Sequence, residues 1–182
     1  MVGRGPFQLV EYDERLEPWY VFLHNEAFAG FDPRPREERL TSRPPGPART
    51  FLVADGPLFV GFADLGPPRE PLAQDMPDEL EIYKIAVLPH YRGRGLGGIL
   101  VGAMTRFAAG AGVKALHAVV SLLDPRLHVF YERHGFGIER VLTEVEGPGR
   151  EPRRLVPPET IAAAPPPGLR VLKILYHYKR GL

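Results

Sequence analysis

The sequence predicts an α+β fold: one domain whose mixed, mostly antiparallel sheet has about seven strands and about four flanking helices. The chain has 182 residues, of which 44% are hydrophobic, enough for one domain with a sizeable core. Its apolar patterns follow the order strand, two helices, three strands, helix, strand, helix, two strands. Hairpin strands beside strand–helix units are typical of a mixed sheet covered by helices.

The first half of the chain predicts two helices and three strands. The run 7–12 predicts the first strand, and apolar residues at helical spacing predict a helix over 17–28. An aspartate in the cap position followed by proline predicts a second helix over 32–40. Residues 49–65 predict two strands that are joined by a central Asp-Gly-Pro turn, which is a hairpin signal.

The second half alternates strands and helices around a glycine-rich stretch. The predicted strands are 80–88, 114–122, 136–145 and 169–179, and the predicted helices are 97–110 and 124–135. Proline and glycine dominate residues 147–168, which predicts a long surface loop whose role is that of a lid, an interface or a connection without structure of its own.

Composition excludes several classes of site. The chain has no cysteine, which removes disulfides, thiolate metal ligands and a cysteine nucleophile. Its six histidines are scattered outside any metal-ligand pattern, so we expect no metal site. The net charge of +1 gives no field toward nucleic acid or membrane surfaces. No apolar run is long enough for a membrane span or resembles a signal peptide, so we expect a cytoplasmic protein.

The stretch "LPHYRGRGLGGIL", residues 88–100, is the densest signal in the chain. It joins a predicted strand to the N-terminus of a predicted helix, where unpaired N–H groups and the helix dipole favour an anion. Glycines let the backbone approach a phosphate without a Cβ in the way. Arg92 and Arg94 add positive charge from their side chains. The stretch therefore predicts a phosphate-binding loop.

Two known phosphate loops are weaker alternatives. A P-loop ends in Gly-Lys-Ser/Thr, and Leu96 and Gly97 follow Gly95 instead. Gly93, Gly95 and Gly98 do match the G-x-G-x-x-G fingerprint of dinucleotide-binding proteins, which would indicate an NAD(P)-dependent oxidoreductase. Too little chain follows for the further strand–helix units of that fold, but the letters leave this alternative open.

A third interpretation is a family resemblance. Residues 92–97 match the R-x-x-G-x-G signature of the GNAT superfamily of N-acetyltransferases. "EIYKIAVLPHYRGRGLG" resembles the family's central strand and pyrophosphate loop, and "FYERHGF" (130–136) resembles its later F-Y-E-x-x-G-F segment. The resemblance is clearest over residues 79–140. It implies one acetyltransferase domain over 1–182, with a sheet that is splayed at the cofactor site.

The resemblance also implies where acetyl-CoA binds. Backbone amides of the loop hold the pyrophosphate in this family, and the central strand pairs with the pantetheine arm. Asp124 stands where the family often has an asparagine that contacts pantetheine; an aspartate cannot donate to a carbonyl, so helix capping is its other interpretation. The implied cofactor-binding residues are Ile85, Ala86, Val87, Arg92, Gly93, Arg94, Gly95, Leu96, Gly97 and Asp124.

For catalysis the resemblance implies direct attack of an amine on the thioester, with general acid–base assistance. Tyr131 matches the family's tyrosine and, with an ordinary pKa near 10, is protonated at neutral pH and able to donate to the leaving sulfur. A tyrosine packed in the core is its other interpretation. Glu81 on the central strand is the candidate base. Glu79 on the same strand face, His117, or a chain of waters are the alternatives.

The acceptor is not specified by the sequence. We expect a small-molecule or protein amine, no nucleic-acid or membrane partner, and a monomer or homodimer, with the closing strand as a candidate dimer edge. A second function class stays open: a CoA-binding sensor or regulatory module that keeps the loop and has lost catalysis. Turnover of any amine separates the two.

Overall fold

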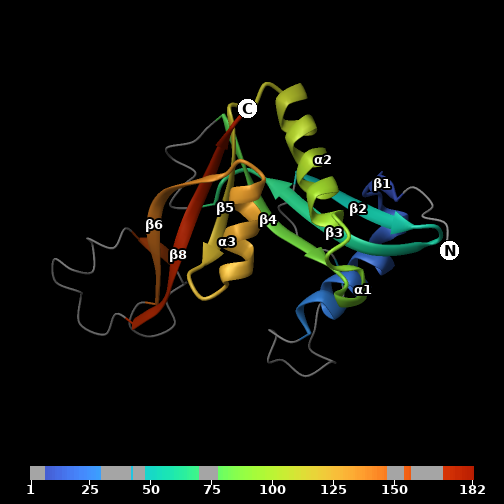
Figure 1. Ribbon diagram of the computed structural model, residues 1–182, viewed down its shortest axis with the longest axis horizontal. Coiled ribbons are helices and arrows are strands. Elements are labelled where there is room, and N and C mark those ends of the chain that lie inside the picture. The colour runs from blue at the N-terminus through green and yellow to red at the C-terminus, as the bar shows by residue number, and fades with distance from the viewer. Residues whose placement is uncertain (1–6, 30–41, 43–47, 70–77, 147–153, 157–169) are drawn as a thin grey trace. The chain divides into compact units, whose positions relative to one another are not determined.

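The computed structural model describes residues 7–29, 42, 48–69, 78–146, 154–156 and 170–182 (Figure 1). Within them lie eight strands and three α-helices. The chain divides into two compact units. An N-terminal unit comprises Met1–Gly66 and Ile82–Gly110, and a C-terminal unit comprises Pro67–Glu81 and Ala111–Leu182. Strand β4 (Glu79–Val87) begins in the C-terminal unit and ends in the N-terminal one.

The sheet of the N-terminal unit has the strand order β1-β2-β3-β4, with β1–β2 and β2–β3 antiparallel. The strands β1 (Gln8–Glu11), β2 (Arg49–Asp55) and β3 (Leu58–Gly66) pair with their neighbours in sequence. The hairpin between β2 and β3 turns at Gly56, whose φ is +59°. This is a left-handed conformation that glycine adopts without strain, and the Asp-Gly-Pro turn predicted from the sequence is confirmed.

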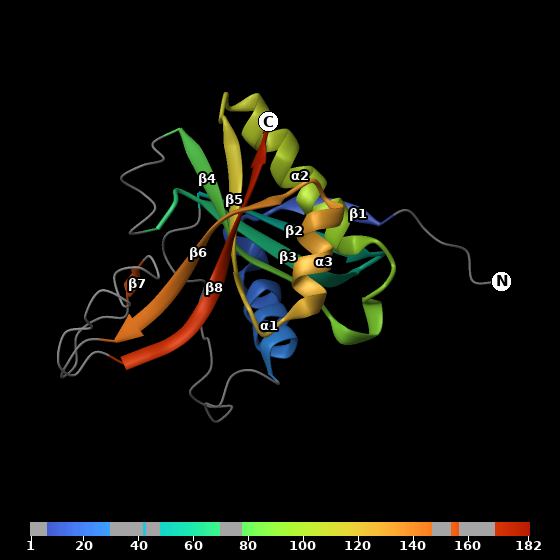
Figure 2. The ribbon, with the colours of Figure 1, turned by 60° about the vertical axis from the view of Figure 1, so that its left-hand side comes forward.

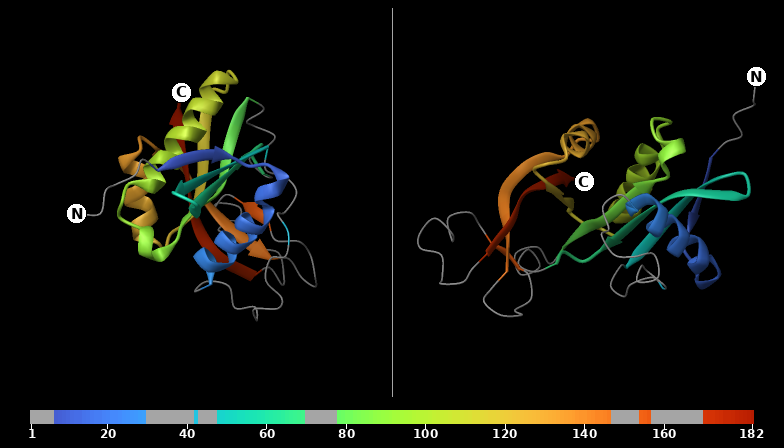
Figure 3. Two further views of the ribbon diagram at one scale, coloured as in Figure 1. Left: turned by 90° about the vertical axis from the view of Figure 1, so that its right-hand side faces the viewer. Right: turned by 90° about the horizontal axis from the view of Figure 1, so that it is seen from below.

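The helices α1 (Glu17–Phe28) and α2 (Leu96–Gly110) cover opposite faces of this hairpin, as Figure 3 shows. Leu52 of β2 packs into a buried cluster with Tyr20 and Leu23 of α1. Its neighbour Phe51 contacts the ring of Phe107 from α2, with ring centroids 6.2 Å apart. Because successive strand residues point to opposite faces, these two contacts assign one helix to each face.

A buried carboxylate joins α1 to the hairpin. Asp64 of β3 is 1% exposed. It accepts hydrogen bonds from the hydroxyls of Tyr20 on α1, at 2.7 Å, and of Thr50 on β2, at 2.6 Å. A carboxylate removed from water needs such donors, since its desolvation is otherwise uncompensated. The three side chains thus fix α1 to two strands in one register.

Removing one donor from this carboxylate tests the arrangement. We expect Tyr20→Phe to lower the free energy of unfolding by about 1.5–3 kcal/mol, because a hydrogen bond to a buried charged group is lost. Denaturant unfolding measures it. The control is Tyr91→Phe, which removes the hydroxyl of a half-buried tyrosine and should change the unfolding free energy by less than about 0.5 kcal/mol. Equal effects of the two substitutions would contradict this role of Asp64.

In the C-terminal unit the sheet begins with the first residues of β4, and the strands beside them lie in the order β5-β8-β6-β7. Strands β5 (Ala115–Ser121), β6 (Gly137–Glu146), β7 (Arg154–Val156) and β8 (Arg170–Gly181) pair in antiparallel fashion. Figure 2 shows β6 and β8 running side by side. Helix α3 (Pro125–Arg133) packs on β8 through Tyr131 and Tyr178, whose stacked rings are 5.9 Å apart.

The α+β fold predicted from the sequence is confirmed, with two differences. Strand β7 lies inside the segment 147–168 that the sequence predicts as a loop, so the sheet has eight strands. Three residues are too few for a periodic signal, and the strand forms because its backbone pairs with β6, Thr143 opposite Val156. The helix predicted over 32–40 falls outside the described residues. None of the described helices is long and apolar enough to cross a membrane.

Candidate active site

The connection from β4 to α2 has the backbone of an anion-binding loop. After β4 a short 3-10 helix, η4 (Pro89–Tyr91), leads to Gly93 and Gly95, whose φ angles are +77° and +81°. Helix α2 starts at Leu96, directly after the second of these glycines. The two left-handed glycines turn the chain sharply. The exposed backbone of residues 92–95 then leads directly into the first amides of α2. This arrangement presents unpaired N–H groups and the positive end of the helix dipole to an anion.

The two arginines of this loop fold back on its own backbone. The Nε of Arg92 donates to the carbonyl of Val87 at 3.0 Å, and an Nη of Arg94 donates to the carbonyl of His90 at 3.2 Å. The Arg94 guanidinium also lies over the Tyr91 ring, 4.9 Å from its centroid. Both side chains are exposed and keep further donors, so each supplies positive charge beside the glycines.

Strand β4 presents an alternating set of backbone groups. The amide of Leu88 donates to the carbonyl of Val60 on β3 at 2.9 Å. Because successive peptide groups of a strand point to opposite edges, Ala86 also directs its groups toward β3, whereas Ile85 and Val87 direct theirs away from it. Of the three backbone positions predicted to pair with pantetheine, two thus have the required direction, and the Val87 carbonyl already accepts from Arg92.

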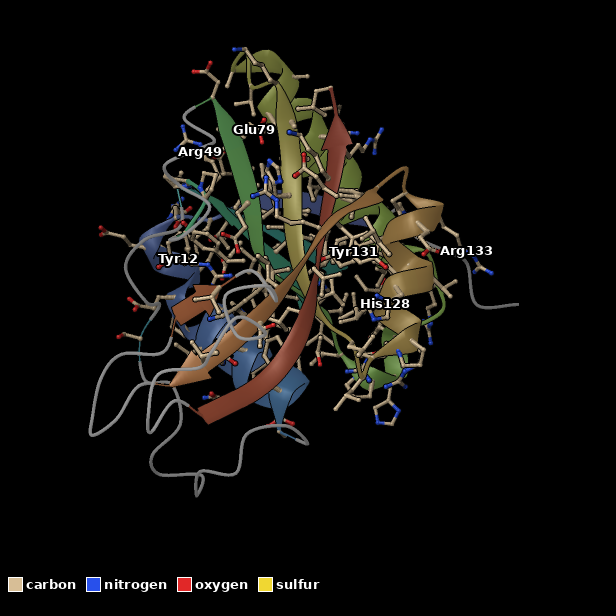
Figure 4. All side chains as sticks on the ribbon, turned by 90° about the vertical axis from the view of Figure 1, so that its left-hand side faces the viewer. Tyr12, Arg49, Glu79, His128, Tyr131 and Arg133 are labelled. Atoms are coloured by element: carbon tan, nitrogen blue, oxygen red, sulfur yellow. The ribbon has the colours of Figure 1, made fainter. Side chains whose placement is uncertain are left out.

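Tyr131 is the buried aromatic residue of α3. Figure 4 shows it with His128 on the side of the helix that faces the strands, whereas Arg133 points away. The side chain is 4% exposed, and no hydrogen-bond partner of its hydroxyl is found among the described residues. Burial and the negative charge of Glu81 raise the pKa of Tyr131 above its ordinary value of 10. The phenol therefore stays protonated at neutral pH and is able to donate.

Glu81 lies on β4 and is 1% exposed. Arg69, from the connection between β3 and β4, holds its carboxylate. The backbone amide of Arg69 donates to Oε2 at 2.9 Å and its Nε donates to Oε1 at 3.0 Å, while an Nη donates to Oε1 as well. Such a fork of charge-assisted bonds compensates the carboxyl group for the water that burial removes. The effect of Glu81 on Tyr131 brings the predicted acid and the predicted base into one electrostatic environment.

The two alternative bases contact one another. Nε2 of His117 on β5 is hydrogen-bonded to Oε2 of Glu79 on β4. Lys179 of β8 donates to Oε1 of Glu79 at 3.0 Å and contacts Glu139 of β6 at 3.2 Å. Figure 4 marks Glu79 at the start of β4. Glu79 and His117 thus bind each other, and Glu79 also binds Lys179 of a third strand. These contacts leave both groups less suited to take a proton from a substrate than the sequence alone suggests.

His117 makes the stability of the fold depend on pH. Burial and the positive charge of Lys179 lower its pKa to about 4, while Glu139 opposes the shift and Arg140 adds to it. An unfolded histidine has a pKa near 6.5. Between pH 4 and pH 6.5 the unfolded state binds a proton that the folded state does not bind. The contribution of neutral His117 to the free energy of unfolding is therefore fully present above pH 6.5 and is lost as the pH falls toward 4.

We expect His117→Gln to remove this part of the acid sensitivity. Between pH 6.5 and pH 4 the wild type should lose roughly 2–3 kcal/mol more of unfolding free energy than the variant. Urea unfolding at a series of pH values measures the difference. His90→Gln, at an exposed histidine of η4, is the control and should leave the wild-type slope unchanged. A variant with the wild-type slope would contradict the depressed pKa.

Asp124 caps α3. Its Oδ1 accepts from the amide of Leu127 at 3.4 Å, and Pro125 follows at the first helical position. Arg126 approaches the same oxygen at 3.8 Å. The capping interpretation of this residue is therefore confirmed. Contact of its side chain with a cofactor stays a prediction from the family resemblance.

Residues 12–136 match the acetyltransferase (GNAT) family, which is more than half of the chain. The protein belongs to the GNAT acetyltransferase family. The matched region includes the glycine loop, β4 and Tyr131, the parts of the sequence on which the resemblance was recognised. Family membership supports an acyltransferase and disfavours the dinucleotide interpretation of the three glycines.

Solved structures share the fold of this GNAT protein at low identity. The ribosomal-protein-S18-alanine N-acetyltransferase of Escherichia coli is 16% identical, with 97% of this chain and 94% of that chain covered and a TM-score of 0.64. A GCN5-related N-acetyltransferase from Kribbella flavida is 19% identical, with coverages of 97% and 98% and a TM-score of 0.64. An acetyltransferase structure from Bacillus anthracis in complex with acetyl coenzyme A is 14% identical, with coverages of 80% and 70% and a TM-score of 0.53. No curated protein matches the chain.

Sequence reasoning missed two residues of this region. Arg69 lies in the proline-rich connection before β4, and Lys179 lies on the last strand, 100 residues from its partner Glu79. Neither belongs to a local pattern. The signal for Arg69 was indirect: a glutamate predicted on a buried central strand requires a cation or several donors, and an arginine in the preceding loop is the nearest source of both.

Proposed function

We propose that this GNAT protein transfers an acetyl group from acetyl-CoA to a primary amine. The observation that carries the proposal is the loop from β4 to α2, with left-handed Gly93 and Gly95 directly before the helix N-terminus. Membership of the family and the buried, protonated phenol of Tyr131 support it. Acetyl-CoA serves as the co-substrate and no metal takes part.

The loop would bind the pyrophosphate of the co-substrate. Amides of residues 92–97 supply uncharged donors, and the N-terminus of α2 supplies partial positive charge. Arg92 and Arg94 would add charge-assisted bonds from their exposed ends. The backbone groups of Ile85 and Val87, directed away from β3, would pair with the amides of the pantetheine arm.

In the reaction the amine nitrogen attacks the thioester carbonyl, a C–N bond forms and the C–S bond breaks. The amine loses one proton and the departing sulfur gains one, so the products are an acetylated amine and free coenzyme A. Tyr131 would give its proton to the sulfur, and its raised pKa keeps the phenol in the protonated form at neutral pH. Glu81 would receive the proton of the amine, directly or through one water.

A CoA-binding sensor without catalysis is the alternative. The position of Tyr131 favours catalysis: a buried phenol whose pKa is perturbed by burial and by a nearby carboxyl group is typical of a functional site, whereas a sensor needs only the loop. The NAD(P)-dependent alternative is less well supported, because the pairs β1–β2, β2–β3, β5–β8, β6–β7 and β6–β8 are antiparallel, whereas a dinucleotide fold is built mainly of parallel strands.

An acceptor screen tests the proposal. The protein is incubated with acetyl-CoA and a panel of primary amines that includes polyamines, amino acids, aminoglycosides and N-terminal peptides. Release of the coenzyme A thiol is followed with a thiol reagent, to which a chain without cysteine contributes no background. Amine-dependent thiol release with a product heavier by one acetyl group supports the proposal. Coenzyme A binding without turnover of any amine would support the sensor instead.

A further inference from the structure

The two side chains of the Arg69–Glu81 ion pair differ strongly in their exposure to solvent. The Glu81 side chain is 1% exposed, whereas that of Arg69 is 57% exposed. A surface ion pair contributes little, because both ends are solvated and mobile. Here the arginine reaches solvent while the carboxyl group is buried, so the guanidinium carries its positive charge inward to Glu81.

The hydrogen bonds also fix the orientation of the carboxylate. Oε1 of Glu81 accepts from both Nε and an Nη of Arg69, which uses the two acceptor positions of this oxygen. Among the described residues Oε2 accepts from the Arg69 amide alone, at 2.9 Å. Within that part of the chain one acceptor position of the carboxyl group is therefore left, and it lies on Oε2. Neither oxygen can rotate away without breaking a bond to Arg69.

We propose that Arg69 is a positioning residue for the acetyl transfer: it holds the Glu81 carboxylate with its one open acceptor position on Oε2 turned to the incoming amine. The inference rests on the proposed function and adds a residue that lies outside the sequence motifs on which the family resemblance rests. Arg69 itself does not touch the reacting atoms. Its guanidinium fork explains why arginine serves here, because a lysine would offer a point charge without the planar geometry by which two nitrogens bind Oε1.

The chain offers a matched control. Arg15 binds Asp13 with the same three groups: its backbone amide at 2.9 Å, its Nε at 3.1 Å and an Nη at 2.8 Å. That pair lies on the surface of the N-terminal unit, with side chains 89% and 45% exposed. Arg15→Ala, like Arg69→Ala, therefore removes two guanidinium hydrogen bonds and keeps the backbone one, at a position with no proposed role.

The experiment compares steady-state kinetics of Arg69→Ala, Arg69→Lys, Arg15→Ala and the wild type, with an amine that the wild type acetylates. We expect Arg69→Ala to lower kcat/KM for the amine about 10- to 100-fold, because a displaced catalytic group loses its alignment. The KM for acetyl-CoA should stay near that of the wild type. Arg69→Lys should fall between the two, and guanidinium at concentrations that do not unfold the protein should restore part of the activity of Arg69→Ala.

A double-mutant cycle shows whether Arg69 acts through Glu81. In a Glu81→Gln background the further change Arg69→Ala should reduce kcat/KM less than about 3-fold, since the positioned group is already gone. Thermal unfolding of each variant confirms that it is folded at the assay temperature. Should Arg69→Ala fail to fold, the lysine variant and the cycle built on it give the same comparison.

The outcomes are distinct. A wild type that acetylates amines, together with an Arg69→Ala variant that keeps wild-type kcat/KM or is not helped by guanidinium, would overturn the positioning role and leave the function intact. The same holds if the losses from Arg69→Ala and Glu81→Gln multiply, because the two residues would then act independently. A wild type that turns over no amine would remove the proposed function and this inference together.

Discussion

Tyr131→Phe should lower kcat about 10²- to 10⁴-fold while leaving the KM for acetyl-CoA nearly unchanged, as expected when a general acid is lost. The ring stays in place, so the packing of α3 on β8 is preserved, and only the hydroxyl is removed. No described residue accepts or donates a hydrogen bond to that hydroxyl, so its removal should cost little stability. Steady-state kinetics with an accepted amine measures the change, and thermal unfolding checks the fold.

Tyr178→Phe is the matched control. Tyr178 lies on β8, is fully buried, and stacks on Tyr131 with ring centroids 5.9 Å apart. Its hydroxyl lies 2.7 Å from Nδ1 of His128. Loss of this phenolic oxygen should reduce stability by about 1 kcal/mol and leave kcat within a few-fold of the wild type. Equal losses of kcat in both variants would show that any buried hydroxyl of this region matters, and the acid role of Tyr131 would be contradicted.

The double substitution Gly93→Val/Gly95→Val should weaken binding of coenzyme A about 30- to 1000-fold. Both glycines have left-handed φ angles, which cost an L-residue about 1–2 kcal/mol each, and a β-branched side chain raises that cost. A Cβ at either position would meet nothing within 4 Å, so the effect comes from backbone strain and not from a clash. The loop would relax in the free protein, and the ligand would have to restore it. Isothermal titration with coenzyme A measures the loss.

Gly102→Ala, within α2, separates loop conformation from general effects of losing glycine. Its added Cβ would lie 3.4 Å from an Nη of Arg106, the flexible end of a long side chain. Alanine favours a helix over glycine by up to about 1 kcal/mol, so this variant should unfold at a higher temperature and bind coenzyme A like the wild type. If the valine variant also bound coenzyme A like the wild type, the glycines would not shape the site.

Local signals in the sequence predicted most of the fold. Helix α1 has the predicted bounds, and the cap at Asp124 with Pro125 after it predicted the start of α3. These elements are set by spacing, caps and turns within a few residues. Strand β7 was missed because its pairing with β6, and not its own three residues, makes it a strand. Its formation depends on partners that are distant in the sequence.

The candidate site, like the fold, was predicted from the sequence only where a local motif marks it. The glycine loop and Tyr131 could be predicted, because each lies in a contiguous stretch that resembles the family. The orientation of Glu81 could not, since it depends on Arg69, twelve residues earlier in a loop without periodicity. The contacts of Glu79 with His117 and with Lys179 could not be predicted either, because they join three strands that are far apart along the chain. Side-chain pairing across strands is a property of the folded sheet.

The most direct test of the central claim is thermal unfolding of the protein with acetyl-CoA, coenzyme A, NAD and NADP, each added separately. A ligand present at about 100 times its dissociation constant stabilises the native state by about 2.7 kcal/mol, which gives a clear rise in Tm. We predict a rise with acetyl-CoA and coenzyme A and none with NAD or NADP. A rise with NAD or NADP alone, or with none of the four, would contradict an acetyl-CoA-dependent transferase built on this loop.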